Sequence, residues 1–303
     1  MEAGSEKHTP DGVKTRHWDL FKLLIGLFGV GLKVTGLYRR GLRNALDVRL
    51  RRLELAFPDL PAAFDGFKIL QLSDLHVDFL PGTLDAALEL VPGLEADLCV
   101  LTGDFRKRVS GPYEQILPSM AKLTARVSAR HGVFAVLGNH DCADMAAAFE
   151  GLGITVLVNE TRSIRQGDTP VHVTGTDDVH YYYTAAAKAA LEDAPRGFKI
   201  ALIHSAELAD MAADAGFHLY LAGHSHAGQV CLPGGIPVLT HMNRLRPYAA
   251  GLWRRAGMVG YSSSGLGVSG LPVRFNTRGE IVLITLRREA PGAADSRIGG
   301  KTL

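Results

Sequence analysis

The feature that most constrains the fold is a series of short apolar runs that each lead into a polar residue. Residues 67–73, 97–102, 132–137, 199–203 and 218–221 have the length of a strand and are apolar almost throughout. Runs of this kind are typical of strands that are buried on both faces. The chain therefore has to place several strands in the interior of a layered domain.

Helix-length patterns separate these runs. We expect helices at residues 83–90, 113–130, 145–152, 185–193 and 207–215. Further strands are expected at residues 155–158, 171–174, 258–262 and 280–286. Strands that alternate with helices indicate βαβ units. We therefore predict an α/β fold in which two sheets pack face to face and helices cover their outer faces.

A polar side chain that can bind a metal follows each of the five runs. These residues are Asp74 with His76, Asp104, Asn139, His204, and His224 with His226. Ligands of α/β sheets bind at the carboxyl ends of the strands. A single Asp or His after a strand is usually a cap or a surface residue, but five such strand ends favour one shared site.

The residue types indicate the chemistry of that site. Asp74 and His76 lie at alternate positions, so a carboxylate and an imidazole can reach one ion. Asp104 can bridge two ions through its two oxygens, and Asn139 offers a neutral oxygen. Nitrogen and oxygen ligands without thiolate suit Mn, Fe, Zn, Ni or Co rather than an iron–sulfur cluster or structural zinc.

The composition is neither that of a disordered chain nor that of a polytopic membrane protein. The chain has 303 residues, of which 47% are hydrophobic and 21% are charged, which is typical of a globular protein. The formal net charge is only +2, and no nucleic-acid partner is expected. The three cysteines are widely spaced, a pattern that fits free thiols in a reducing compartment.

The N-terminal region combines an apolar segment with a basic one. The uninterrupted apolar part, residues 23–32, is shorter than the roughly 20 residues that span a bilayer, unless Lys22 and Lys33 extend outward to both interfaces. Six arginines follow between Arg39 and Arg52. The two segments favour attachment to an anionic membrane surface. The alternatives are a helix packed on the domain and, for the basic part, a solvated surface element.

The ordered motifs of this chain resemble those of the calcineurin-like metallophosphoesterases. They are D-x-H at residues 74–76, G-D at 103–104, G-N-H-D at 138–141, the lone His204 and G-H-x-H at 223–226. The resemblance covers residues 67 to about 287. It implies a four-layer α/β/β/α sandwich of two mixed sheets flanked by helices.

The resemblance also implies a role for each site residue. Asp74, His76 and His226 would hold one divalent ion, Asn139, His204 and His224 the other, and Asp104 would bridge them. His140 would be the catalytic histidine that contacts the substrate phosphate and assists the leaving group. Asp141 would orient His140. The implied reaction is attack on phosphorus by a hydroxide that two metal ions activate, and Mn2+ is the ion that we expect first.

Two stretches, GHSHAGQVCLPGG and SSSGLGVSGLPVRFNTRGEI, resemble the membrane-associated bacterial phosphodiesterase branch, which includes UDP-2,3-diacylglucosamine pyrophosphatases. The expected substrate is therefore a phosphodiester or pyrophosphate in a phosphorylated small molecule or lipid, such as UDP-diacylglucosamine, in lipid A biosynthesis. The alternatives are a phosphomonoesterase or protein phosphatase of the same fold, and a metal-bearing lipid-binding module without catalysis.

The expected organisation has four parts. Residues 1–19 form a disordered start, residues 20–55 a membrane-associating segment, residues 56–288 the phosphoesterase domain and residues 289–303 a disordered tail. We expect the enzyme at the cytoplasmic face of the inner membrane, attached peripherally or by one N-terminal anchor. Arg106, Lys107 and Arg108 after Asp104 form either a solvated loop or a positive rim, and His180 is expected to have a structural or surface role.

Overall fold

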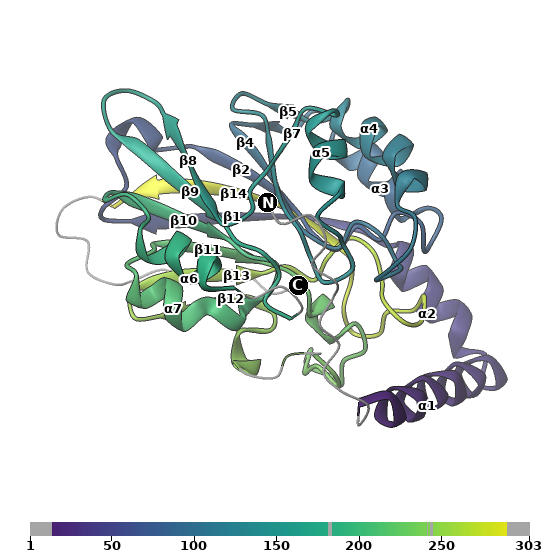
Figure 1. Ribbon diagram of the computed structural model, residues 1–303. Helices are drawn as coiled ribbons and strands as arrows, with labels where there is room; N and C mark the ends of the chain where they lie inside the picture. The colour runs from purple at the N-terminus through teal and green to yellow at the C-terminus, as the bar shows by residue number, and fades with distance from the viewer. Residues whose placement is uncertain (1–13, 181–183, 241, 243–244, 290–303) are drawn as a thin grey trace.

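The computed structural model describes residues 14–180, 184–240, 242 and 245–289, and Figure 1 shows their arrangement. Two six-stranded sheets form the centre of the molecule. The first sheet has the order β1 (Arg49–Phe57), β14 (Glu280–Arg288), β2 (Lys68–Leu72), β4 (Leu98–Thr102), β6 (Val133–Val136), β7 (Ile154–Val156). The second has the order β12 (Gly251–Arg255), β13 (Met258–Ser262), β11 (Leu219–Ala222), β10 (Phe198–Leu202), β9 (Pro170–Gly175), β8 (Glu160–Arg165).

Both sheets are mixed. In the first sheet β14 runs antiparallel to β2, and the strands from β2 to β7 are parallel. In the second sheet the antiparallel strands β8 and β12 lie at the two edges, and the four central strands are parallel. A short pair, β3 (Glu95–Ala96) and β5 (Ser128–Ala129), is separate from them.

Three hydrophobic clusters define four layers. One cluster joins side chains of both sheets, for example Ile69 and Val100 of the first with Val173 and Ile200 of the second. The other faces of the sheets pack against helices. The helices are α3 (Thr83–Leu90), α4 (Leu117–Thr124), α5 (Met145–Glu150) over the first sheet and α6 (Ala185–Glu192), α7 (Ala209–Asp214) over the second. The predicted α/β/β/α sandwich of two mixed sheets is confirmed.

Strand β4 shows why these runs are apolar throughout. All five of its residues are buried. Leu98 and Val100 face the other sheet, whereas Cys99 and Leu101 face the helices, as the alternation of side chains along a strand requires. Because both faces are covered, no position along the strand can be polar without a buried partner.

The helix expected over residues 113–130 is shorter than predicted. A 3-10 turn, η2 (Glu114–Ile116), precedes α4, and Pro118 lies in the first helical turn of α4. Proline favours that position because it has no N–H to donate. Residues 128–129 then leave the helix to form β5, which accounts for the early end.

The N-terminal region contains two helices before the first strand. Helix α1 (Lys14–Val34) begins within the range 1–19 that was expected to be disordered, and the rest of that range lies outside the described residues. Helix α2 (Leu37–Leu46) follows. Among the residues that the structure describes, no helix is both long enough and apolar enough to cross a membrane. The expected tail, residues 289–303, falls outside the description apart from its first residue.

Strand β1 lies within the basic part of the N-terminal region. It pairs in parallel with β14 along its whole length, from Arg49 opposite Glu280 to Phe57 opposite Arg288. The expected domain boundary between residues 55 and 56 falls inside this strand. Residues 49–55 are therefore part of the folded sheet.

Candidate metal centre

The seven side chains expected to bind metal lie together where strands of both sheets end. Asp74 and His76 follow β2, Asp104 follows β4, and Asn139 follows β6 of the first sheet. His204 follows β10, and His224 and His226 follow β11 of the second sheet. Except for Asn139, which is half-buried, all of these side chains are buried. The site therefore forms only where the two sheets meet.

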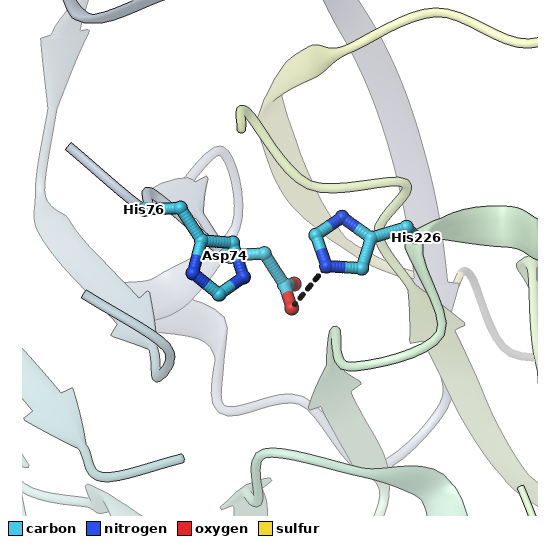
Figure 2. Close-up of side chains that lie close together, drawn as sticks. All are labelled: Asp74, His76 and His226. Carbon is cyan, nitrogen blue, oxygen red and sulfur yellow. Dashed lines mark ion pairs between the residues drawn. The ribbon is translucent and has the colours of Figure 1, made fainter. Parts of the chain in front are cut away.

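One cluster consists of Asp74, His76 and His226. Figure 2 shows the two imidazoles on either side of the Asp74 carboxylate, with His226 Nε2 3.5 Å from Asp74 Oδ1. The ring of His76 stacks on that of His226 with centroids 5.3 Å apart. One ligand atom from each of the three residues lies within 4.8 Å of the others, as a shared cation requires.

A second cluster consists of Asp104, His204 and His224, with the Asn139 amide among them, and a third group that could hold an ion consists of His76, Asp104 and His140. Asp104 Oδ2 is 3.4 Å from His204 Nε2, and His224 Nδ1 is 3.2 Å from the same nitrogen. Asn139 Oδ1 lies 2.9 Å from His224 Nδ1 and 3.1 Å from His204 Nε2.

Asp104 also connects the two clusters. Its Oδ2 lies 3.7 Å from Nε2 of His76, which belongs to the first cluster. The structure thus brings the seven side chains together, with Asp104 close to His76 on one side and to His204 on the other.

Backbone carbonyls fix which ring nitrogen of His76 and of His204 faces the site. His76 Nδ1 donates to the Arg106 carbonyl at 2.8 Å, and His204 Nδ1 donates to the Thr102 carbonyl at 2.8 Å. A neutral imidazole that donates through Nδ1 has a lone pair at Nε2. Histidine ligands of metals are held by such bonds. Nε2 of both residues therefore faces the site.

His76 and Asp104 both present electron pairs to the site. His76 Nε2 is buried and has no hydrogen-bond partner within the described part of the chain. Burial lowers the pKa of His76 to about 4, although Asp104 opposes the shift, so its ring is neutral. Burial also opposes the charge of Asp104, but the neighbouring His204 and His140 hold its pKa well below the usual value. The Asp104 carboxylate beside the neutral imidazole of His76 fits a divalent cation.

The backbone of the site is strained. Asp74, His76, Asp104, His224 and His226 all have positive φ, between 38° and 67°. Residues other than glycine rarely adopt a positive φ, and those that do are often found at functional sites. The sharp turns after the strands explain it, since each must point a side chain back over the end of its sheet.

Glycines make room for these turns. A Cβ at Gly138 would lie 2.3 Å from Asp104 Oδ1, and a Cβ at Gly223 would lie 2.2 Å from Asp74 Oδ2. Both distances are far below van der Waals contact. The glycine before Asn139 and the glycine before His224 are therefore needed for the carboxylates to reach the site.

His140 lies beside the clusters and reaches solvent. Its backbone N–H donates to Asp104 Oδ1 at 2.9 Å, and its Nε2 is 3.9 Å from Asp104 Oδ2. Its Nδ1 donates to the carbonyl of Lys107, and its side chain is 18% exposed. Nε2 is therefore the ring nitrogen that faces the site.

Asp141 does not orient the ring of His140, contrary to the role expected from the sequence. Its buried carboxylate instead accepts three backbone N–H bonds, from Asp104 at 2.8 Å, Phe105 at 3.0 Å and Gly138 at 2.7 Å. The Lys107 carbonyl occupies the position next to the ring that Asp141 was expected to take. Asp141 therefore braces the turn that carries Asp104 against the turn that carries Asn139.

Arg106 is neither solvated nor on a positive rim. Its side chain is buried, and its Nε donates to the His140 carbonyl at 2.7 Å. Lys107 and Arg108 are exposed, and Lys107 Nζ lies over the ring of Phe79 at 3.9 Å. Only these two residues can add positive charge to the surface here.

Sequence reasoning missed two groups that support the site. The first follows β9, where Asp178 is buried and the ring of His180 stacks on the His224 ring with centroids 4.3 Å apart. Polar residues after a parallel strand were the available signal, because the same rule identified the other strand ends. Tyr181, Tyr182 and Tyr183, which follow, lie outside the described residues.

The second group is Arg274 and the loop that it holds. This arginine is fully buried and donates to the carbonyls of Ser264 and Gly267 at 2.6 Å each, and to that of His226 at 3.3 Å. The same loop donates to the Asp74 carbonyl through the Gly267 N–H at 2.8 Å. No local pattern reveals this role, because the bonds join residues far apart in the sequence.

Comparison with known proteins agrees with this geometry. A family model described as calcineurin-like phosphoesterase matches residues 67–228. The chain is 30% identical to the metallophosphoesterase YkuE of Bacillus subtilis over 75% of this chain and 82% of the relative. It is 28% identical to phosphodiesterase YaeI of Escherichia coli over 73% of this chain and 82% of the relative. It is 33% identical to UDP-2,3-diacylglucosamine pyrophosphatase LpxG of Chlamydia trachomatis over 41% of this chain and 38% of the relative.

Proposed function

This chain belongs to the calcineurin-like phosphoesterase family and is a hydrolase of phosphoric esters, and from that premise we propose that it cleaves a phosphodiester or pyrophosphate bond at a dinuclear metal centre. One observation carries the proposal. Seven side chains from five strand ends converge, and Asp104 lies beside His76 of one cluster and His204 of the other.

We assign one divalent ion to Asp74, His76 and His226, and the other to Asn139, His204 and His224, with Asp104 between them. The donor atoms are imidazole nitrogens, carboxylate oxygens and one amide oxygen, which suit Mn2+ first and Zn2+, Fe2+, Ni2+ or Co2+ as well. When bound, such a pair of ions supplies a clamp for the phosphate and an acidified water.

His140 is the residue that we propose acts on the substrate. With Nδ1 held by the Lys107 carbonyl, Nε2 faces the site and reaches solvent. In the imidazolium form both nitrogens donate, so Nε2 can bind a phosphoryl oxygen or give a proton to the leaving oxygen. The Arg106 bond to the His140 carbonyl and the Asp104 bond to its N–H keep the ring in this position.

The substrate that we propose is lipid-linked, such as UDP-diacylglucosamine, and the place of reaction is the cytoplasmic face of the inner membrane. The partial similarity to a protein named UDP-2,3-diacylglucosamine pyrophosphatase supports the substrate class. Support for the membrane comes from α1, which exposes large apolar side chains, and from Arg39, Arg40 and Arg43 of α2, which are exposed. An apolar helix next to basic residues favours attachment to anionic lipid.

Hydrolysis of bis-(p-nitrophenyl) phosphate tests the proposal. We expect turnover with Mn2+ and loss of turnover with a chelator. Asp104→Asn should remove most activity because this residue serves both clusters, whereas Asp144→Asn, an exposed carboxylate nearby, should change little. His140→Ala should slow turnover and keep the metal. Equal rates with Mn2+ and with chelator would refute a metal-dependent reaction.

A substrate panel separates this proposal from its alternatives. UDP-diacylglucosamine, a soluble diester, p-nitrophenyl phosphate and a phosphopeptide are compared at equal enzyme concentration. Faster hydrolysis of either monoester would favour a phosphomonoesterase or protein phosphatase. Metal binding without turnover of any of the four would favour a non-catalytic, metal-bearing lipid-binding protein.

A further inference from the structure

We propose that residues 232–239 form a second membrane-binding element, which inserts into the interface of an anionic bilayer beside the metal centre. The segment reads LPGGIPVL and has no charged residue. Its four large apolar side chains are between 44% and 61% exposed, and they are Leu232, Ile236, Val238, Leu239. Contiguous exposed apolar side chains of this size mark interaction sites.

The segment is a closed turn. Cys231 and Pro237 form an antiparallel bridge, and the Leu232 N–H donates to the Ile236 carbonyl at 2.9 Å. At the base, the Val238 N–H donates to the Val230 carbonyl at 3.1 Å. Because the backbone is bonded across the turn, the apolar side chains project from a defined structure.

The base of the turn is joined to the metal centre. Leu232 is six residues after the ligand His226, and an extended chain covers at most about 3.5 Å per residue, so the two lie within ~20 Å. Gln229, between them, donates through Nε2 to the carbonyls of Ser269 and Leu271 at 2.9 and 2.7 Å. The segment 269–275 also contains Arg274, which bonds to the His226 carbonyl. A membrane contact at the turn therefore places the metal centre close to the lipid surface.

Helix α1 rests on the same segment. A Cβ at Gly29 of α1 would lie 3.2 Å from a methyl of Leu271. The described residues of α1 are otherwise mostly exposed, including six large apolar side chains at 44% to 82%, which are Leu23, Leu24, Leu27, Phe28, Val30, Val34. Figure 1 shows α1 and the green loops that precede β12 at the same lower end of the molecule. The turn and α1 are thus both attached to the segment 269–275 and expose apolar side chains.

Charge decides between possible occupants of this surface. Arg39, Arg40 and Arg43 are exposed on α2, whose buried Gly41 packs on Val273 and Phe275 of the same segment. An apolar surface beside three cations is complementary to an anionic bilayer, which offers both acyl chains and negative headgroups. The arrangement suits an enzyme whose substrate stays in the membrane, and to that extent the inference rests on the proposed function.

Vesicle sedimentation of the full chain tests the inference, with phosphatidylcholine alone and with added phosphatidylglycerol. Ile236→Ser with Val238→Ser should lower the partition coefficient about tenfold on both compositions, because two large apolar side chains leave the interface. High salt should weaken wild-type binding to anionic vesicles by screening the arginines, and it should leave the effect of the double variant unchanged. Ile236→Trp should strengthen binding, because tryptophan favours the interface.

The control is Val158→Ser, which removes a side chain that is 38% exposed elsewhere on the domain. Wild-type-like partition of the double variant, or an equal loss with Val158→Ser, would overturn the inference. The inference would also be overturned if the wild type formed a dimer without lipid and the double variant were a monomer, since the turn would then be an interface between copies of the chain. Turnover of a soluble diester should stay within about twofold in all variants. If the wild type did not hydrolyse the soluble diester at all, the proposed function would be refuted, and the vesicle-binding result would still stand.

Discussion

Replacing Asp141 with asparagine tests whether this residue supports the two turns at the metal centre or orients the ring of His140. Oδ2 of Asp141 accepts from the N–H groups of Asp104 and Gly138, and Oδ1 accepts from Phe105. An asparagine oxygen can replace Oδ2 and keep two bonds. Its NH2 group would then face the Phe105 N–H, so one buried donor loses its acceptor.

The magnitude follows from that count. A hydrogen bond to a charged acceptor contributes about 1.5–3 kcal/mol, and an unsatisfied buried donor costs about 1–3 kcal/mol. Burial and the nearby Asp104 raise the pKa of Asp141 to about 6, so the neutral amide relieves some repulsion. We expect Asp141→Asn to lower the free energy of unfolding by about 2 kcal/mol, and Asp141→Ala, which leaves three donors unsatisfied, by about 4 kcal/mol.

Urea unfolding of the chelator-treated protein measures the effect. With a slope of about 3 kcal/mol per molar urea, Asp141→Asn should move the midpoint down by about 0.7 M. Asp144→Asn is the matched control, because that side chain is exposed and should change stability by less than about 0.5 kcal/mol. Metal affinity should fall together with stability, since Asp104 and Asn139 lose their common support. An Asp141→Asn variant with the midpoint and metal content of the control, but slower turnover, would refute the brace and restore the orienting role.

Three further predictions follow from other contacts. Arg274→Lys should lower the free energy of unfolding by about 3 kcal/mol in the same urea assay, because one ammonium cannot reach the Ser264, Gly267 and His226 carbonyls together; an unchanged midpoint would contradict this. Gly223→Ala should abolish metal binding, measured as bound metal after gel filtration, because its Cβ would overlap Asp74 Oδ2; Gly26→Ala, with open space around it, should bind metal like the wild type. Burial lowers the pKa of His218, whose Nδ1 accepts from the Lys199 N–H. The unfolded chain therefore binds more protons between that lowered pKa and about 6.5, and the free energy of unfolding should rise with pH over this window. His218→Gln should flatten the rise, and curves of unfolding free energy against pH that run parallel for variant and wild type would contradict the assignment.

The strand ends could be predicted because burial on both faces leaves a plain signature. A run such as residues 98–101 is apolar at every position, so the first charged residue after it, Asp104, stands out. Strand β1 gave no such signature. Arg49, Arg51 and Arg52 are interspersed with leucines, without strict alternation, at the edge of the first sheet, where one face and one side of the strand meet solvent. The same pattern fits a surface helix, and only pairing with β14 decides between them.

The roles of individual residues within the site depend on hydrogen bonds that cannot be predicted from the sequence. The G-N-H-D motif places Asp141 next to His140 in the chain, yet its carboxylate turns toward the backbone of residues 104 and 105. Arg274 is 48 residues from His226, with which it bonds. Residue type and spacing predicted which side chains meet, whereas the hydrogen bonds that hold them come from the packing of the two sheets.

The position of β14 has a consequence for the order in which the chain folds. This last strand lies between β1 and β2, so it separates two strands that are neighbours in the sequence. While the ribosome is still making residues 280–288, β2 has an open edge toward that side and β1 has no partner in the sheet. The arginines of β1 disfavour pairing of this unpaired strand with other chains, as charged residues do at exposed sheet edges. Closure of the first sheet, and with it a settled position for the turn that carries Asp74, must therefore wait until residues 280–288 have been synthesised.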